Sequence, residues 1–345
     1  FATDISPEHP VLVDRYVLGK EAEVDVICDG EDVFIPGIFE QIERAGVHSG
    51  DSMAVFPPFN LTEDEKSTII KNTVAIGRAL KVVGLMNIQY VIKGGKVYCI
   101  EVNPRASRTV PIISKVTGIG MVSIATRIMT GKKLKDFGYS TGLLTPPDFY
   151  TIKAPVFSFD KLKLVETSLG PEMKSTGEVL GLGFKKVNAL FKAMSASGIN
   201  IPKAGNALIS IANRDKEELF DLAQRLLNLG YKLYGTKETY KFLADKGIEI
   251  NPAYLPGDGV PNVIELMKDN VIDLIINTPT KGKNPGKLGF KIRRLAVELR
   301  TPCITSLDTA ISAITVLEEE KKGNDLRANS LNDLLETYKD KSIIY

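Results

Sequence analysis

The sequence lacks tryptophan, has only two histidines, and contains no long apolar run. A membrane-spanning helix needs about 20 consecutive apolar residues, so the sequence predicts no membrane span. An excess of one charge is also missing, because 44 basic and 42 acidic residues leave a formal net charge of +2. This balance gives no reason to expect a nucleic acid or an anionic membrane surface as a partner.

Cysteine is scarce as well. Cys28, Cys99 and Cys303 lie far apart, and this spacing fits neither a zinc site nor a disulfide framework. We therefore expect reduced thiols and a cytoplasmic location. The content of 43% hydrophobic and 25% charged residues is that of a globular protein with a sizeable core. A length of 345 residues suggests two domains, and the start at Phe1 rather than at a methionine suggests a piece of a longer chain.

The first half, residues 1–150, mixes strands and helices irregularly. Two strands over residues 23–40 meet at Asp29-Gly30, a strong signal for a hairpin. A helix is predicted over residues 62–81, where Thr62 and Glu65 have the spacing of a capping box. Further strands over residues 86–92 and 96–103 and a broken helix over residues 110–131 follow. We interpret this half as an α+β lobe.

The second half changes character. Residues 151–200 have the weak periodicity of a connector, whereas residues 201–345 alternate five strand-like runs with helices. Such repeats predict a parallel sheet with helices on both faces. The fold class is therefore α/β, with the first lobe at 1–150, a connector at 151–200 and a Rossmann-like domain at 201–345. The tail from residue 321 is expected to form one more helix.

A candidate metal site lies on the paired strands of the first half. Glu101 and Asn103 are two residues apart on a strand, so their side chains point the same way. Both offer oxygen ligands, and Mg²⁺ bound to nucleotide phosphates takes few ligands from the protein. Gln89 on the partner strand supplies a third oxygen if the strand register permits it.

The connection between these strands decides that register. A two-residue turn at Gly94-Gly95 would place Gln89 opposite Ile100, on the face away from Glu101. A three-residue connection that includes Lys96 would place Gln89 opposite Glu101. We expect the longer connection, with a glycine in a left-handed conformation.

Arg105 and Arg108 follow the metal-site strand directly. Their guanidinium groups could hold phosphate oxygens and neutralise the charge that develops during phosphoryl transfer. The alternative is that Glu101 and Asn103 form the solvated side of an ordinary strand. Spacing alone leaves both interpretations open.

Hydroxyl and amide side chains follow the predicted strands of the second half. Parallel α/β sheets bind ligands at the carboxyl ends of their strands, where helix N-termini attract anions. Alternatively, these side chains only cap helices, as Ser and Thr at helix starts usually do. The residues concerned are Ser210, Lys216, Thr236, Thr239, Asn277 and Thr278.

Longer motifs carry a resemblance to a known family. They read AGVHSGDS (45–52), GLMNIQY (84–90), IEVNPRASRTVP (100–111) and LGPEMKSTGEVLGLG (169–183). Together they closely resemble the second ATP-grasp unit of carbamoyl-phosphate synthase large chains. The similarity continues to about residue 320, where the second half resembles the methylglyoxal-synthase-like allosteric domain of that family.

The resemblance implies roles for individual residues of the first half. It implies ATP with Mg²⁺ or Mn²⁺ as cofactors, and K⁺ as a further cation. The implied metal ligands are Gln89, Glu101 and Asn103. The implied catalytic residues are Arg105, Arg108 and His48. The implied ATP-binding residues are Arg15, Glu21, His48 and Ser49.

For the second half, the resemblance implies that the strand-end residues hold the phosphate of an allosteric nucleotide such as UMP. Ala154 and Cys303 stand where ornithine-activated relatives have Glu and Tyr, which argues against ornithine. The implied reaction is ATP-dependent phosphorylation of carbamate, for pyrimidine and arginine synthesis. The implied partners are a small glutaminase subunit and the rest of the large chain, in an oligomeric enzyme.

Two other functions are compatible with the same residues. One is a non-catalytic nucleotide sensor, and the other is an ATP-grasp ligase that acts on a different carboxylate. The family's glycine-rich lobe over the phosphates precedes these motifs, and only a short stretch precedes Glu21 here. We therefore expect little or no activity from this polypeptide alone.

Overall fold

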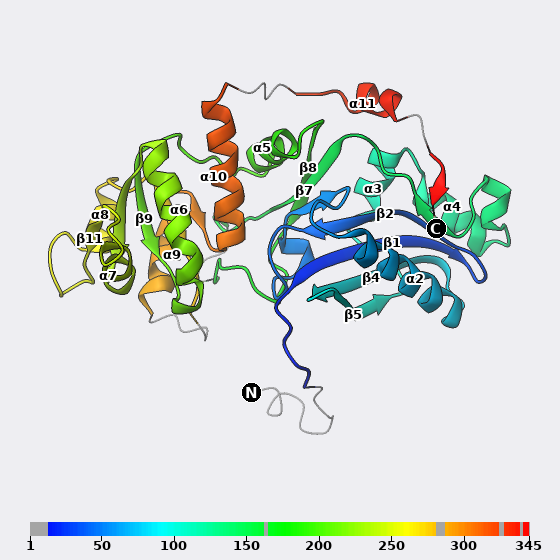
Figure 1. Cartoon of the computed structure of the whole chain (residues 1–345), viewed down its shortest axis with the longest axis horizontal. Helices are drawn as coiled ribbons and strands as arrows, with labels where there is room; N and C mark the ends of the chain where they lie inside the picture. Colours follow the sequence, from blue (N-terminus) through cyan, green and yellow to red (C-terminus); the bar gives the residue numbers. More distant parts are fainter. Residues whose placement is uncertain (1–12, 162–164, 281–286, 324–327, 339–340, 345) are drawn as a thin grey trace.

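The computed structural model describes residues 13–161, 165–280, 287–323, 328–338 and 341–344. These residues form two units, each built on its own sheet, that lie side by side along the long axis of the molecule (Figure 1). The first unit has a mostly antiparallel sheet, and the second has a parallel sheet. The predicted class, α/β with two different halves, is confirmed.

Nine strands form the first sheet within the described residues, with the main order β5-β4-β1-β2-β3-β7-β8; β6 pairs with β2, and β14 pairs with β6. The strands are β1 (Lys20–Asp29), β2 (Val33–Gln41), β3 (Ala54–Phe56), β4 (Val83–Lys93), β5 (Lys96–Asn103), β6 (Gly142–Leu144), β7 (Tyr150–Val156), β8 (Gly177–Gly183) and β14 (Ile343–Ile344). The predicted hairpin between β1 and β2 is present, and Gly30 in its turn has a φ of 90°.

Helices cover both faces of this sheet. One face packs against α2 (Glu63–Ala79), whose N-cap Thr62 forms the predicted capping box with Glu65. The other face packs against α3 (Val110–Thr117) and α4 (Met121–Met129). The chain breaks between these two helices at Gly118, which has a left-handed φ of 69°.

Residues 151–200, expected to connect the halves, contribute to the first sheet. β7 pairs with β3, β8 pairs with β7, and α5 (Lys186–Ala196) packs on both strands. The prediction of a mere connector is wrong, because Gly177, Gly181 and Gly183 weaken the strand pattern of β8 in the sequence. The glycines have a packing reason, since a Cβ at Gly181 would lie 2.1 Å from the carbonyl oxygen of Ala189 in α5.

The second unit confirms the five predicted strand–helix repeats. Its strands run parallel in the order β11-β10-β9-β12-β13. The strands are β9 (Asn206–Ser210), β10 (Lys232–Thr236), β11 (Asn251–Ala253), β12 (Leu274–Asn277) and β13 (Cys303–Ile304). The helices are α6 (Lys216–Leu229), α7 (Lys237–Ala244), α8 (Val263–Lys268), α9 (Leu288–Leu299) and α10 (Leu307–Lys321).

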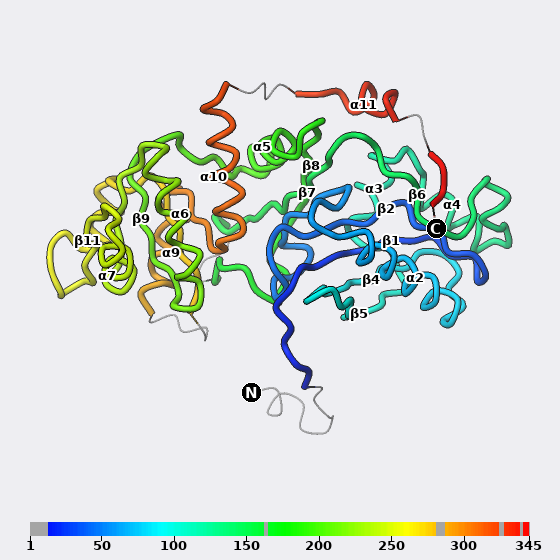
Figure 2. The backbone as a smooth tube through the Cα atoms, in the orientation of Figure 1, coloured from blue at the N-terminus to red at the C-terminus, as the bar shows by residue number. Residues whose placement is uncertain are grey.

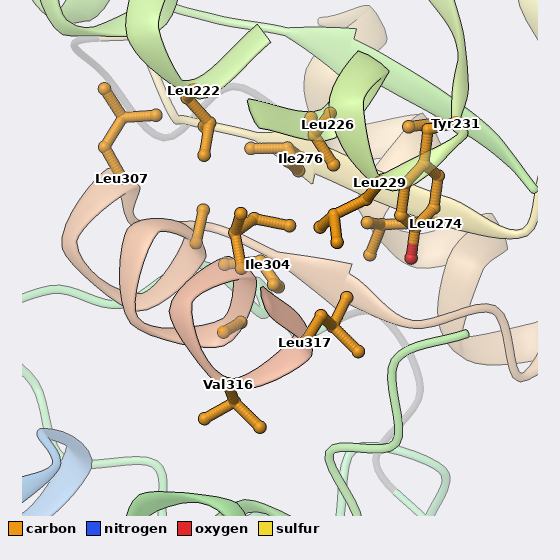
Figure 3. Packing of buried hydrophobic residues seen from close by; sticks show 14 of the residues in the cluster. Leu222, Leu226, Leu229, Tyr231, Leu274, Ile276, Ile304, Leu307, Val316 and Leu317 are labelled. Atoms are coloured by element: carbon orange, nitrogen blue, oxygen red, sulfur yellow. The ribbon is translucent and has the colours of Figure 1, made fainter. Parts of the chain in front are cut away.

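The core of the second unit follows from the helical spacing of leucines in α6. Leu222, Leu226 and Leu229 lie on one face and are buried against Leu274 and Ile276 of β12 (Figure 3). α10 closes the same core from the other side, with Leu307 and Leu317 pointing inward. The same cluster extends to α5 and β7, so the two units share apolar packing.

The C-terminal tail leaves the second unit and returns to the first, as the trace in Figure 2 shows. Its last helix, α11 (Leu331–Thr337), contacts α3, and β14 pairs with β6. Leu334 and Tyr338 are buried in the core of the first unit. The single helix expected from residue 321 is therefore wrong: α10 ends at Lys321, and a separate helix and strand follow beyond residues that lie outside the described part.

Across the described residues, no single helix has the length and apolar character needed to cross a membrane. The pair α3 and α4 passes this test only when taken together, and the two helices are bent by 110° at their junction.

We predict that Leu334→Ala lowers the free energy of unfolding by about 2–4 kcal/mol, because the side chain is buried and its removal leaves a cavity. Urea unfolding measures this change, and Glu336→Ala, at an exposed position of the same helix, is the control. If Leu334→Ala unfolds like the control, the tail does not belong to the cooperative unit of the first domain.

Candidate active site and effector pocket

A cleft of about 320 Å³ opens beside the first sheet. It gathers most of the predicted catalytic, metal and ATP residues of the first half. Its wall is formed by Glu23, His48, Ser49, Gly50, Asn87, Gln89, Glu101, Arg105, Ser107, Arg108, Thr109, Lys153, Met173 and Glu178.

Three neighbouring strands supply a grid of polar side chains to this cleft. Gln89 of β4 lies between Glu23 of β1 and Glu101 of β5 in the register. One step along, Asn87 lies between Asp25 and Asn103 in the same manner. Because alternate residues of a strand share a face, these six side chains point to one side of the sheet.

The turn between β4 and β5 is shorter than expected. Lys93 pairs with Lys96 across a two-residue turn, and both Gly94 and Gly95 have positive φ angles, as a type I′ turn requires. The register then shifts between Gln89 and Tyr90, leaving Ile100 as the extra residue of a β-bulge. The predicted pairing of Gln89 with Glu101 is thus confirmed, but the bulge produces it rather than a longer connection.

The donor set suits a hard divalent cation. The Nδ2 of Asn103 donates to Glu101 Oε1 at 2.9 Å, and the Nε2 of Gln89 donates to Ser49 Oγ at 3.1 Å. Each amide uses its nitrogen in these bonds, so its oxygen remains the atom available to a cation. One carboxylate and two amide oxygens are few ligands, which is typical of Mg²⁺ that is also held by phosphates.

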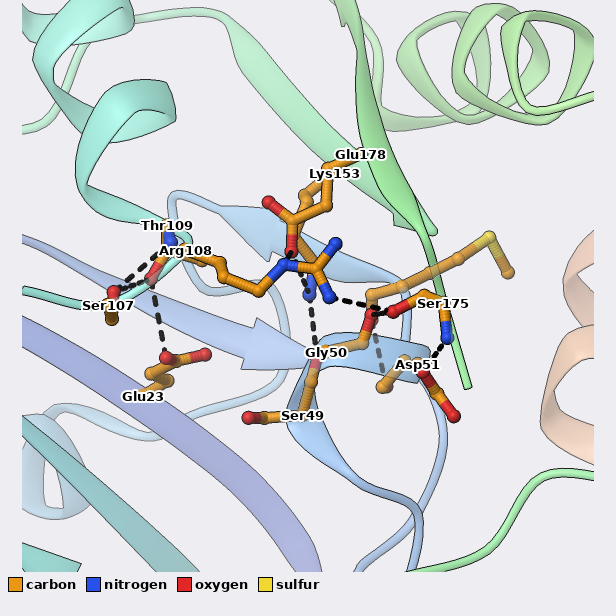
Figure 4. A network of polar contacts seen from close by, with 12 residues as sticks. Glu23, Ser49, Gly50, Asp51, Ser107, Arg108, Thr109, Lys153, Ser175 and Glu178 are labelled. Carbon is orange, nitrogen blue, oxygen red and sulfur yellow. Dashed lines mark hydrogen bonds and ion pairs between the residues drawn. The ribbon is translucent and has the colours of Figure 1, made fainter. Parts of the chain in front are cut away.

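The loop after β2 lines the cleft with His48, Ser49 and Gly50, and Figure 4 shows Ser49 and Gly50 beside Arg108. His48 precedes the short helix η1 (Ser49–Asp51), and its Nδ1 accepts from the backbone N–H of Gly50 at 3.0 Å. The proton of a neutral imidazole therefore lies on Nε2. The buried side chain of Lys153 fixes this loop, because its Nζ donates to the carbonyl oxygen of Ser49 at 2.6 Å.

Arg108 crosses the cleft toward β8. Its Nε lies 3.3 Å from Glu178 Oε1, and its Nη1 donates to Ser175 Oγ at 2.9 Å (Figure 4). Arg105 is exposed at the mouth, where its Nη1 donates to the neighbouring Ala106 carbonyl at 3.0 Å. The two arginines thus differ: Arg108 is fixed in place, and Arg105 is open to a ligand.

Carboxylates of β1 are buried beneath the cleft. Burial, and then repulsion by Glu23, raise the pKa of Glu21 to about 8. The same two causes raise the pKa of Asp25 to about 7, although hydrogen bonds from Thr109 and Ser107 lower it. A buried site that holds several acids close together favours bound cations.

Three of the predicted residues lie off the cleft wall. Asn103 reaches it through its contact with Glu101, and Glu21 is buried beneath it on β1. Arg15 is exposed on the extended segment before β1. Lys153 and Glu178 line the cleft, but sequence reasoning did not single them out. Glu23 and Asn87 were also missed, although the alternation of β1 and β4 could have indicated them.

The second unit holds two adjoining pockets at the carboxyl ends of its strands. The chain runs outward from β9 to β11 and then returns to β12, so strand order reverses between β9 and β12. A pocket of about 240 Å³ at this point includes Ser210, Asn277 and Thr278. Its neighbour, of about 560 Å³, includes Ser210, Thr236 and Thr239.

Five of the six predicted effector residues therefore meet, as expected of a topological switch point. Lys216 does not line either pocket, and its Nζ lies 5.8 Å from the ring centre of Phe242. Sequence reasoning missed Arg293, a buried guanidinium on the wall of the smaller pocket.

The fold and these sites define an ATP-grasp domain followed by a domain of the methylglyoxal-synthase-like (MGS-like) type. Residues 2–137 match the family described as carbamoyl-phosphate synthase L chain, ATP binding domain, and residues 218–305 match the MGS-like domain. These two stretches of the chain therefore carry the sequence features of the two domain families.

Relatives with matching sequence are described as carbamoyl phosphate synthase large chains. Those of Thermoanaerobacter sp. (strain X514), Thermoanaerobacter pseudethanolicus and Caldanaerobacter subterraneus subsp. tengcongensis are each 50% identical over 98% of this chain. The chain spans 31% of the length of these relatives. Among solved structures, a biotin carboxylase domain of a single-chain bacterial carboxylase is 19% identical, with a TM-score of 0.43 over 54% of this chain and 48% of that chain, too weak a likeness to support an argument.

We predict that the free energy of unfolding falls as the pH rises from about 5 to 8. Glu21 has an ordinary pKa of 4.5 and a folded pKa of about 8, so the native state keeps a proton that the unfolded state has released. The contribution of one such group is at most about 1.4 kcal/mol per pH unit. Urea unfolding at several pH values checks this slope.

Glu21→Gln should flatten the slope, because the variant has no proton to lose at this position. Glu63→Gln, at an exposed position, should leave the slope unchanged. An identical pH dependence of Glu21→Gln and the wild type would contradict the raised pKa of Glu21.

Proposed function

We propose that this chain is the C-terminal part of a carbamoyl-phosphate synthase large subunit and supplies the site that phosphorylates carbamate with ATP. The proposal is supported by the similarity to these large chains over 98% of the chain. It is also supported by the pairing of Gln89 with Glu101 at the head of a cleft that holds two arginines. That pairing is the observation on which the proposal rests.

In this function, the residues of the cleft act by position and charge. Gln89, Glu101 and Asn103 would hold Mg²⁺ or Mn²⁺, which would supply charge neutralisation to the transferring phosphoryl group. Arg105, at the open mouth, binds phosphate oxygens, and Arg108 places a second positive charge deeper in the cleft. His48 presents Nε2–H to the same space, because its Nδ1 is occupied.

The wider setting is part of the proposal. The enzyme would draw ammonia from a glutaminase subunit, use the rest of the large chain for the other reaction steps, and act in the cytoplasm for pyrimidine and arginine synthesis. ATP would contact Ser49 and the exposed Arg15, with Glu21 beneath. K⁺ is a further cation that the buried carboxylates could attract. The MGS-like domain would bind a regulatory nucleotide such as UMP.

The reaction itself is tested by ADP release in the assembled enzyme. We expect carbamate to stimulate ADP formation at this site more than acetate or formate does, because its N–H groups can donate to the carboxylates that line the cleft. Glu101→Gln should abolish the stimulation by carbamate. Equal stimulation by other acids would instead favour an ATP-grasp ligase with a different substrate.

Metal binding provides a test without turnover. We predict that Glu101→Gln weakens Mn²⁺ binding in the presence of ATP by about tenfold or more, because the variant loses the one carboxylate of the set. Electron paramagnetic resonance of free Mn²⁺ measures the affinity. Glu249→Gln, at an exposed position of the second unit, is the control. Unchanged affinity in Glu101→Gln would exclude this cation site.

Nucleotide binding tests the second unit. We predict that Ser210→Ala weakens UMP binding about two- to tenfold, because the hydroxyl lies on the wall of both pockets. Lys216→Ala should change the affinity by less than about twofold, since its side chain lies over Phe242. Calorimetric titration measures both affinities.

If Lys216→Ala bound UMP much more weakly and Ser210→Ala bound it with unchanged affinity, the nucleotide would bind at a different place. UMP binding in the absence of any ATP-dependent Mn²⁺ binding would favour a sensor without catalysis.

A further inference from the structure

A continuous series of contacts joins the pocket between β9 and β12 to the catalytic cleft. It passes through residues 166–178, which we call the bridging segment. This segment lies on the wall of the pocket at Glu166 and on the wall of the cleft at Glu178. One short stretch of chain therefore contacts both sites.

At the pocket, Arg293 of α9 connects the effector residues to the bridging segment. Its Nη1 donates to Asn277 Oδ1 at 2.5 Å. Its Nε and Nη2 donate to the two carboxylate oxygens of Glu166 at 2.7 and 2.5 Å. The side chains of Arg293 and Glu166 are only 6% and 15% exposed, so this ion pair is held away from solvent.

Within the bridging segment, the contacts continue toward the first unit. Glu166 Oε1 also accepts from the backbone N–H of Ser168 at 2.9 Å, and Lys174 Nζ donates to the Ser168 carbonyl. The backbone N–H groups of Lys174 and Ser175 both donate to the carboxylate of Asp51, at 2.8–3.0 Å. Asp51 is fully buried and belongs to the loop that carries His48.

At the cleft, the bridging segment contacts the catalytic groups directly. The backbone N–H of His48 donates to the Gly170 carbonyl at 2.7 Å. Ser175 Oγ donates to the Gly50 carbonyl and accepts from Arg108 Nη1, each at 2.9 Å (Figure 4). A displacement of the bridging segment would therefore move the His48 loop and Arg108 together.

We propose that Arg293 is a positioning residue that couples the effector pocket to the catalytic cleft. A phosphate-bearing ligand in the pocket competes with Glu166 for the guanidinium group of Arg293. The loss of this partner changes the placement of the bridging segment, and with it that of the His48 loop and Arg108. The inference rests on the proposed function of the pocket as an effector site.

The physical basis is a difference in affinity between two states. A ligand shifts a conformational equilibrium only if it binds one state better than the other. Here the difference arises because the planar guanidinium group can give its paired donors either to the Glu166 carboxylate or to a phosphate. A buried carboxylate that loses its partner is strongly destabilised, so the segment that carries Glu166 must rearrange.

The experiment is hydrogen–deuterium exchange of the whole chain with and without UMP. In the wild type, we expect UMP to change the exchange of amides at residues 46–52 and 170–176 by about fivefold or more, within the usual range of coupling between sites. Glu166→Gln should bind UMP at least as tightly by calorimetry, because the carboxylate that competes for Arg293 is gone, but UMP should then change these amides by less than about twofold. A purely structural role of Glu166 would not remove the response to UMP selectively.

Glu218→Gln is the matched control. It breaks another ion pair between the units, that of Glu218 with Arg44 at 2.7 Å, which lies off the bridging segment. This control should keep the full response. If Glu166→Gln does not fold, as judged by circular dichroism, Glu166→Asp replaces it with the same expected loss, because its shorter side chain cannot keep both bonds to Arg293.

The outcomes separate the two proposals. A wild type that binds no UMP refutes the effector pocket and this inference with it. UMP binding without a change at residues 46–52 refutes the coupling alone. A response that persists in both Glu166 variants also overturns the role of the Arg293–Glu166 pair.

Discussion

The candidate site depends on one irregularity of the backbone, the bulge at Ile100. The two-residue turn at Gly94-Gly95 sets a register in which Tyr90 faces Cys99, and a regular continuation would place Gln89 opposite Ile100. In a strand, a shift by one residue turns every following side chain to the other face. The bulge makes that shift just before Glu101, so Glu101 and Asn103 join Gln89 and Asn87 on one side. Without it, the strand would still form, but the polar grid would not.

The grid has an electrostatic cost that the surrounding residues partly offset. Glu21, Glu23 and Asp25 occupy alternate positions of β1, and all three are buried. Lys153 and Arg108 supply the nearby positive charge, and both also lie close to Glu178. Burial and repulsion by Glu23 nonetheless raise the pKa values of Glu21 and Asp25. The arrangement is therefore one whose carboxylates are better satisfied with bound cations, as a site for metal–nucleotide complexes requires.

The sequence allowed correct prediction where a local pattern determines structure. The capping box of α2, the β1–β2 turn, the leucine face of α6 and the five parallel strands all depend on residues that are close in the chain. Prediction failed where the decisive partner is distant. Gly181 weakens a strand pattern, yet its close contact with Ala189 in α5 explains it. The alternation of β1 indicates its acids, whereas the position of Lys153 depends on the pairing of β7 with β3, strands that are far apart in the chain.

The ion pairs between the two units also join residues that are distant in the chain, and they differ in burial and therefore in strength. Arg44 reaches across to Glu218 and Asp308, but its side chain is 37% exposed, and exposed pairs contribute about 0–1 kcal/mol. The Arg293–Glu166 pair is buried and doubly bonded, so the loss of one partner has a much larger effect. Shared apolar packing around α5 and α10 holds the units together in either case. Loss of one partner of such a pair strongly destabilises the other partner. This property suits a conformational switch better than an interaction that only holds the two units together. The pair that lies on the pocket wall is the one that has this property.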